Sequence, residues 1–228
     1  MKVAVFTDIH GNLQALEAIL KDIEKEQVDK IICLGDIIGI GPESRECLDL
    51  IMNSNVEMLL GNHELYYLKG IQIEDDRDYE KIKYYKWVSE RLESKHREFL
   101  TNCKYQIVIS NVLFEHFLIH GKNEYYPFYK TTVLYDSKFP EIVKQIKEDY
   151  IFVGHEHLPF ELEKNGKTII DQGSSGCTHD NNTNYLIVNI NDKVTWYKKI
   201  IKYDYKKLKE VLKMTDYPVK DFYERVFF

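Results

Sequence analysis

Five predicted strands of this 228-residue chain are each followed by side chains that can bind metal ions. The blocks are Asp8-Ile9-His10, Gly35-Asp36, Gly61-Asn62-His63-Glu64, His120-Gly121 and Gly154-His155-Glu156-His157. Residues two apart in an extended segment point to the same side, so Asp8 and His10 can reach one ion together, as can His155 and His157. Parallel α/β sheets hold ligands beyond the carboxyl ends of their strands, where all five blocks stand. The five loops are therefore expected to meet at one site.

The donor groups in these blocks are carboxylate, amide and imidazole, without a thiolate. Two Asp, one Asn and five His are about what two metal ions require. Such a mixed set of nitrogen and oxygen ligands suits manganese, iron or zinc better than calcium or a structural zinc. The blocks therefore predict a metal-dependent hydrolase of phosphate esters, with manganese as the expected metal and iron or zinc as alternatives.

Composition limits the partners and the location. The net charge of −6 and the lack of a basic cluster argue against general nucleic-acid binding, but leave nucleotides open as substrates. No apolar run approaches the ~20 residues of a membrane span, and the chain starts with a core strand, so neither a membrane anchor nor a signal peptide is expected. The four cysteines lack C-x-x-C spacing, which predicts free thiols in a reducing cytoplasm.

The first third of the chain alternates predicted strands and helices, which indicates a parallel sheet with right-handed crossovers. The strands span 2–7, 30–34 and 56–60, and the helices span 13–26 and 42–53, with Pro42 at the first helical position. Further strands are expected at 105–109, 112–119 and 151–153 and in LPFELEK, KTIIDQ, YLIVNI and VTWYKKI, with a helix near 138–148.

Residues 71–101 interrupt the series of blocks with a charged, tyrosine-rich segment. Its pattern predicts one or two helices that cover the rim of the site. Tyr85 and Trp87 are expected either to form the core of this lid or to stack on a substrate. A helix near 204–214 precedes an aromatic tail, which is expected to pack on its own sheet or across a homodimer. The whole chain, 1–228, is interpreted as a single domain with a C-terminal helix and tail from about 203.

The order D-x-H, GD-x-x-G, GNH-[DE], H-G, GH-x-H resembles the calcineurin-like metallophosphoesterase superfamily. The phrases TDIHGNLQALEAIL, LGDIIGIGP, LGNHE, LIHGK and VGHEHLPF look closest to its small bacterial and archaeal phosphodiesterase branch. The likeness covers roughly residues 1–70 and 115–200. It implies an α/β fold, a four-layer α-β-β-α sandwich of two mixed sheets flanked by helices, here with a helical insertion.

The resemblance also implies a dinuclear metal site. One ion would be bound by Asp8, His10, Asp36 and His157, and the second by Asp36, Asn62, His120 and His155. His63 would face the phosphate with Asn62 and protonate the leaving oxygen, after a hydroxide that bridges the metals attacks phosphorus. His116 lies four residues before His120, so strand periodicity does not choose between them; Gly121 favours His120 by resemblance.

Several functions remain open at this point. A phosphodiester or nucleotide-type substrate is expected, with dinucleoside polyphosphate hydrolysis and Ser/Thr protein dephosphorylation as alternatives. Protein phosphatases of this superfamily carry arginines where Leu60 and the Ile40-Gly41 region stand here, which weakens that alternative. A binding scaffold on the same fold is the non-enzymatic alternative, and the complete ligand set argues for catalysis. The role of Glu64, where the small phosphodiesterases usually have Asp, stays open.

Overall fold

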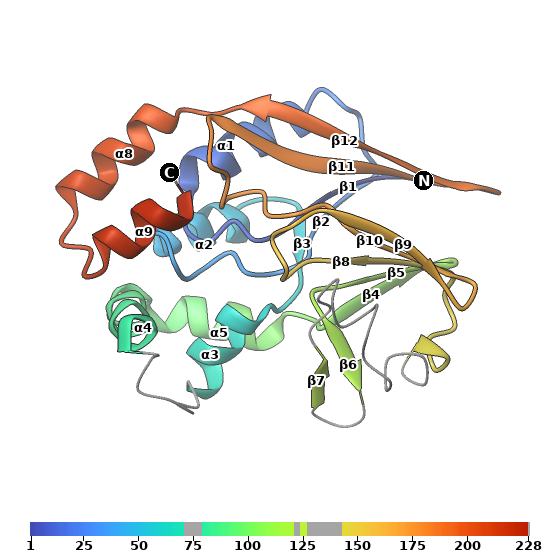
Figure 1. Ribbon diagram of the computed structural model, residues 1–228, viewed down its shortest axis with the longest axis horizontal. Helices are drawn as coiled ribbons and strands as arrows, with labels where there is room; N and C mark the ends of the chain where they lie inside the picture. Colours follow the sequence, from blue (N-terminus) through green and yellow to red (C-terminus); the bar gives the residue numbers. More distant parts are fainter. Residues whose placement is uncertain (71–78, 121–123, 127–142, 228) are drawn as a thin grey trace.

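Two five-stranded sheets form the centre of the molecule (Figure 1). The computed structural model describes residues 1–70, 79–120, 124–126 and 143–227, and within them all side chains except those of 79–81, 118–120, 124–126, 222, 226 and 227. The first sheet has the order β12 (Val194–Lys202), β11 (Asn182–Ile190), β1 (Lys2–Phe6), β2 (Lys30–Cys33), β3 (Val56–Met58). The second has the order β4 (Gln106–Ile109), β5 (Val112–Glu115), β8 (Tyr150–Val153), β10 (Lys167–Asp171), β9 (Phe160–Lys164).

Both sheets are mixed, and their central strands are parallel. β1, β2 and β3 pair in parallel, whereas β11 runs antiparallel to β1. In the second sheet, β5, β8 and β10 pair in parallel, and the edge strands β4 and β9 are antiparallel. The predicted α/β fold with two mixed sheets is thus confirmed. The parallel strands explain how loops distant in sequence can share one end of the fold.

Alternation along β1 shows how the core is built. Val3 and Val5 face the space between the two sheets, and Ala4 and Phe6 face the helices, with all four side chains fully buried. The helices on that side are α1 (Leu13–Ile23) and α2 (Ser44–Met52). Asn12 caps α1 by accepting a hydrogen bond from Ala15 N at 3.0 Å. The strand is buried on both faces, as expected for a continuous apolar run in a parallel sheet.

Three helices follow β3: α3 (Asn62–Lys69), α4 (Tyr79–Arg91) and α5 (Ser94–Asn102). The predicted helices of the insert are therefore present, although residues 71–78 lie outside the described part. α3 begins at Asn62 itself, which the sequence did not indicate clearly. The sequence predicts Pro42 as the first helical residue of α2. The helix begins instead at Ser44, and Pro42 precedes its N-cap residue, Glu43.

The C-terminal tail packs on the insert of its own chain. The helix expected near 204–214 is α8 (Tyr205–Met214), and the tail after it forms a second helix, α9 (Lys220–Phe227), on the same side of the molecule as α4 (Figure 1). The ring of Tyr217 lies 5.2 Å from that of Trp87 and 5.7 Å from that of Tyr223. The tail therefore contacts α4 of its own chain, and its packing across a homodimer stays a prediction.

The segment predicted as one strand over 112–119 is broken. β5 ends at Glu115, and β6 (Leu118–His120) pairs instead with β7 (Glu124–Tyr126) in a separate two-stranded sheet. Of the helix expected near 138–148, residues 138–142 lie outside the described ranges, and residues 144–148 form a turn and irregular structure rather than a helix. Among the described helices, none combines the length and apolar character that crossing a membrane requires.

Candidate metal centre

The loops after five parallel strands converge on one buried cluster of donor atoms. Asp8 and His10 follow β1, Asp36 follows β2, Asn62 and His63 open α3 after β3, His116 follows β5, and His155 and His157 follow β8. These residues, apart from His63, form two groups, and Asp36 of the second group also faces the first.

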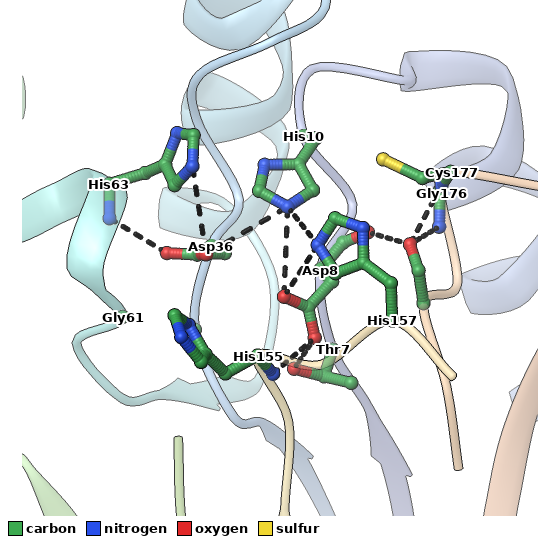
Figure 2. A network of polar contacts seen from close by, with 12 residues as sticks. Thr7, Asp8, His10, Asp36, Gly61, His63, His155, His157, Gly176 and Cys177 are labelled. Carbon is green, nitrogen blue, oxygen red and sulfur yellow. Dashed lines mark hydrogen bonds and ion pairs between the residues drawn. The ribbon is translucent and has the colours of Figure 1, made fainter. Parts of the chain in front are cut away.

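The first group consists of Asp8, His10 and His157 (Figure 2). Nε2 of His10 lies 2.9 Å from Nε2 of His157 and 3.6 Å from Oδ1 of Asp8, and Nε2 of His157 lies 3.4 Å from the same oxygen. The other carboxylate oxygen of Asp8 accepts hydrogen bonds from Thr7 Oγ1 at 2.7 Å and from the backbone of His155 at 3.1 Å. Asp8 Oδ1 is buried without a hydrogen-bond partner in the described part of the chain.

The second group consists of Asp36, Asn62, His116 and His155. Nε2 of His116 lies 3.2 Å from Asp36 Oδ2 and 3.3 Å from Asn62 Oδ1. Nδ1 of His155 lies 2.7 Å from the same Asn62 oxygen. One donor atom each from Asp36, His116 and His155 lie within 4.8 Å of one another. This is a compact set of two imidazoles, a carboxylate and an amide oxygen.

Asp36 stands between the two groups. Its Oδ1 accepts a hydrogen bond from the backbone N–H of His63 at 2.8 Å. Its Oδ2 faces His116 at 3.2 Å and His10 at 3.8 Å, so one oxygen is directed at both groups. Burial acts to raise the pKa of Asp36, but the facing His116 and His63 outweigh it and lower that pKa overall. The carboxylate is therefore ionised at neutral pH.

The donor atoms present their lone pairs inward, which fits divalent cations. Nδ1 of His10 lies 3.3 Å from the carbonyl oxygen of Ile38, so Nδ1 donates to that oxygen and Nε2 keeps a free lone pair. That Nε2 faces a second imidazole nitrogen and a carboxylate oxygen. Converging nitrogen and oxygen atoms of this kind are ligands that transition metals accept.

The second group contains His116, which strand periodicity left open beside His120. The chain leaves the second sheet after Glu115, so His116 directly follows a parallel strand, as the other donors do. The backbone of His120 belongs to β6, and its side chain lies outside the described residues. The fourth ligand of the second group is therefore reassigned, as a proposal, from His120 to His116.

Several donors have left-handed backbone conformations. The φ values are 55° for Asp8, 50° for His10, 53° for Asp36, 82° for His155 and 64° for His157. The sequence suggested that pairs such as Asp8 and His10 converge because they alternate along an extended segment. They converge instead because each residue turns the chain in a region that costs L-amino acids about 1–2 kcal/mol. Uncommon conformations of this kind cluster at functional sites.

Glu64 holds the loops that carry Asp36 and Asn62. Its fully buried carboxylate accepts backbone hydrogen bonds at 2.8 to 3.1 Å from Asp36, Ile37, Ile38 and Gly61. Burial and the charge of Asp36 raise the pKa of Glu64, whereas these backbone donors favour its ionised form. The open role of Glu64 is thus structural: it ties the loop after β2 to the start of α3.

His63 lies beside the donors, and one of its ring nitrogens is within 4.8 Å of a donor atom each of His10 and Asp36. Its ring is 4.5 Å from that of His10, and its Nε2 is 4.0 Å from Asp36 Oδ2. Tyr84 and Tyr85 cover it, with ring-centre distances of 6.2 and 5.3 Å. Burial lowers the pKa of His63 well below its usual range, and the charge of Asp36 opposes that effect.

The two aromatic residues proposed to contact substrate differ in position. Tyr85 adjoins His63 but is buried. Trp87 faces away from the donors: its Nε1 donates to Asp216 at 3.0 Å, and the Arg91 guanidinium lies 3.7 Å from its ring centre. The packing of Trp87 against α8 and α9 favours the alternative that it forms part of the lid core, and its contact with substrate stays a prediction.

Comparison with known proteins identifies related chains. The calcineurin-like phosphoesterase family matches residues 1–159. An uncharacterized protein of Methanocaldococcus jannaschii is 31% identical over 187 residues, covering 81% of this chain and 73% of that protein. A symmetrical bis(5'-nucleosyl)-tetraphosphatase of Psychromonas ingrahamii is 31% identical over 86 residues, covering 36% of this chain and 31% of that enzyme.

Two solved structures share the fold over the full chain. A metallophosphoesterase from Sphaerobacter thermophilus superposes with a TM-score of 0.75 at 21% identity, covering 100% of this chain and 99% of that one. A hypothetical protein from Pyrococcus horikoshii superposes with a TM-score of 0.79 at 20% identity, covering 100% and 97%. At these identities the likeness concerns the fold.

Proposed function

This chain belongs to the calcineurin-like phosphoesterase family, and we propose on that premise that it hydrolyses phosphodiester or nucleotide-type substrates at a centre of two divalent metal ions. It is a metal-dependent phosphoester hydrolase by family. The observation that carries the dinuclear assignment is Asp36 Oδ2, a single carboxylate oxygen directed at both donor groups. A carboxylate in that position can bridge two cations and reduce their repulsion.

The residues divide between the two ions as the groups suggest. Asp8, His10, His157 and Asp36 would hold the first ion, and Asp36, Asn62, His116 and His155 the second. Such a pair supplies charge neutralisation and water activation to phosphate ester hydrolysis. Manganese, iron and zinc all accept nitrogen and oxygen ligands of this kind, and the sequence-based expectation of manganese stays a prediction.

Two further residues have other roles: Glu64 positions the ligand loops, and His63 is assigned to protonate the leaving group. Glu64 keeps Asp36 and the start of α3 in register through backbone hydrogen bonds. We assign His63 as the group that gives a proton to the leaving oxygen, an assignment that its place beside both groups supports. Burial lowers the pKa of His63, and the negative charge of a bound phosphate would act in the opposite direction, toward the protonated form that this role requires.

Dinucleoside polyphosphate hydrolysis is the second candidate. It is favoured by the match to the Psychromonas tetraphosphatase, although that match spans less than a third of that enzyme. The two candidates differ in the substrate and not in the metal centre. A homodimer and a cytoplasmic location also remain predictions, which light scattering and cell fractionation would test.

A hydrolysis panel tests the proposal. Protein loaded with manganese or zinc is assayed on a nitrophenyl monoester, a nitrophenyl diester, diadenosine tetraphosphate and a phosphopeptide, and its metal content is measured. We expect two ions per chain and the highest kcat/KM on the diester or the dinucleotide. Asp36→Asn should lose both ions and nearly all activity, whereas Asp49→Asn, on the outer side of α2, should keep both. A variant Asp36→Asn that retains two ions and normal turnover contradicts the dinuclear assignment.

A further inference from the structure

A cysteine that belongs to none of the five sequence blocks lies beside the first donor group. Cys177 stands in the loop between β10 and β11 and is half-buried. Its sulfur and one ring nitrogen each of His10 and His157 lie within 4.8 Å of one another. Figure 2 shows the Cys177 side chain directed from its loop toward the His157 ring. The second group, in contrast, contains only nitrogen and oxygen donors among the described residues.

The Cys177 loop is fixed to the strand end that carries Asp8. Ser174 Oγ donates to the carbonyl oxygen of Asp8 at 2.7 Å and accepts from the backbone N–H of Cys177 at 2.7 Å. The backbone N–H of Gly176 donates to the same Asp8 oxygen at 3.0 Å. A side chain at position 176 would meet the carbonyl oxygen of Ile9 at 1.9 Å. This packing sets the thiol at a fixed place relative to the first group.

Asp8 supplies a second, independent sign of a cation at this place. Its Oδ1 is fully buried, lacks a hydrogen-bond partner in the described chain, and faces the Nε2 atoms of His10 and His157. A buried carboxylate oxygen without a donor is costly unless a positive charge meets it. The thiol therefore borders a position that other side chains already prepare for a metal.

We propose that Cys177 is a thiolate ligand of the ion in the first group, together with Asp8, His10 and His157. This inference rests on the metal centre proposed above. On ligation the thiol gives its proton to solvent and its sulfur binds the cation. A thiolate favours zinc over manganese, because soft donors bind soft or borderline cations. The two sites then differ in chemistry: the first selects zinc, and the second, without sulfur, accepts manganese.

Cobalt spectroscopy tests this assignment directly. The protein is stripped of metal, loaded with two equivalents of Co²⁺, and its absorption spectrum is recorded. Co²⁺ in a protein site shows ligand-field bands in the visible, and a coordinated thiolate adds a charge-transfer band in the near ultraviolet. We expect both in the unmodified protein. Cys177→Ser should keep the ligand-field bands and lose the charge-transfer band, whereas Cys103→Ser, a matched half-buried cysteine on α5's C-terminal side, should keep both.

The outcomes separate this inference from the metal centre itself. Ligand-field bands without a charge-transfer band, or a charge-transfer band that persists in Cys177→Ser, overturn the Cys177 assignment alone. The absence of ligand-field bands overturns the metal centre and this inference with it.

Alkylation of the unmodified protein gives an answer that needs no variant. Metal loading should slow the reaction of Cys177 with iodoacetamide at least tenfold, in line with the loss of the nucleophilic lone pair to the cation, and leave Cys103 unchanged. Equal rates at Cys177 with and without metal overturn the proposal.

Competition between zinc and excess manganese tests the predicted selectivity. The ratio of bound zinc to bound manganese should be lower in Cys177→Ser than in the unmodified protein by at least about tenfold. An unchanged ratio overturns the predicted selectivity.

Discussion

At the scale of single residues, the site depends on carboxylates in which one oxygen accepts hydrogen bonds from the chain and the other faces the donor groups. Asp36 gives one oxygen to the backbone of His63 and directs the other at both donor groups. Asp8 gives one oxygen to Thr7 and His155 and directs the other at His10 and His157. Such second contacts orient a ligand before it meets its ion.

His63→Ala should keep both metals and lose rate, because His63 is assigned to proton transfer. General acid catalysis typically contributes about 10²–10⁴-fold to a rate. The loss should be smallest for nitrophenyl substrates, whose leaving groups need little protonation. Metal content and kcat/KM for good and poor leaving groups are the measurements, with the exposed His179→Ala as the control. Equal losses for both kinds of leaving group argue against the acid role.

Glu64→Gln should destabilise the protein. The amide offers one acceptor oxygen where the carboxylate offers two, so two of the four backbone N–H groups lose their acceptor. Each unsatisfied buried donor costs about 1–3 kcal/mol, which gives a loss of roughly 2–6 kcal/mol in urea unfolding. Glu57→Gln, at a part-exposed pair with Lys30, should cost below about 1 kcal/mol. Similar losses in the two variants would refute the clamp role.

At the scale of elements, the sequence is most informative where a donor directly follows a parallel strand. Asp8, Asp36 and Asn62 follow apolar runs, and the sequence alone shows where those predicted strands end. His116 is not, because 112–119 looks like one strand and its break at Glu115 depends on pairing of β6 with β7. Cys177 is equally hidden, since its position depends on Ser174 contacting a strand end 166 residues away. Local sequence patterns therefore predict where strands end, whereas the positions of His116 and Cys177 depend on contacts between distant parts of the chain.

Strand β5 also carries a buried acid next to the site. Glu115 is 1% exposed, and burial, aided by the charge of Glu148, raises its pKa to about 8. A raised folded-state pKa means that the folded chain holds a proton which the unfolded chain releases near pH 4.5. Stability from this group is therefore full below that pH and is lost as the pH rises toward about 8.

Glu115→Gln should remove this slope. In metal-free protein, the stability of the variant relative to the native chain should rise between about pH 5 and 8 by roughly 1.4 kcal/mol per pKa unit of the shift, and level off above. Urea unfolding at several pH values measures it. Glu161→Gln, at an exposed position on β9, should show no such trend. A difference between Glu115→Gln and the native chain that does not vary with pH contradicts the assignment.

At the scale of the whole molecule, the insert and the C-terminal tail form one layer over the site. Trp87, Tyr217 and Tyr223 pack together although about 130 residues separate α4 from α9. The same layer presents Tyr84 and Tyr85 to His63. Tyr66 is the aromatic neighbour of His63 that is exposed, at 37%. Stability and substrate contact are therefore assigned to different aromatic residues.

Trp87→Ala and Tyr66→Ala should separate these roles. Trp87→Ala should lower the free energy of unfolding by about 3–5 kcal/mol, as loss of a buried aromatic side chain does, and leave the kcat/KM ratio between a dinucleotide and a nitrophenyl diester unchanged. Tyr66→Ala should change that ratio with little loss of stability, since a stacked base is worth about 1–3 kcal/mol. Denaturant unfolding and the two rate ratios are measured. A shifted ratio in Trp87→Ala would return this residue to the substrate site.

The left-handed backbone affects which substitutions evolution can accept at five of the donors, Asp8, His10, Asp36, His155 and His157. A mutation to glycine at any of these positions relieves a conformation that L-residues resist, and removes buried polar atoms as well. The relief offsets part of the cost of losing the hydrogen bonds that the carboxylates of Asp8 and Asp36 accept. Backbone conformation alone therefore favours glycine at these positions, and the polar side chains found there are explained by the binding of an ion.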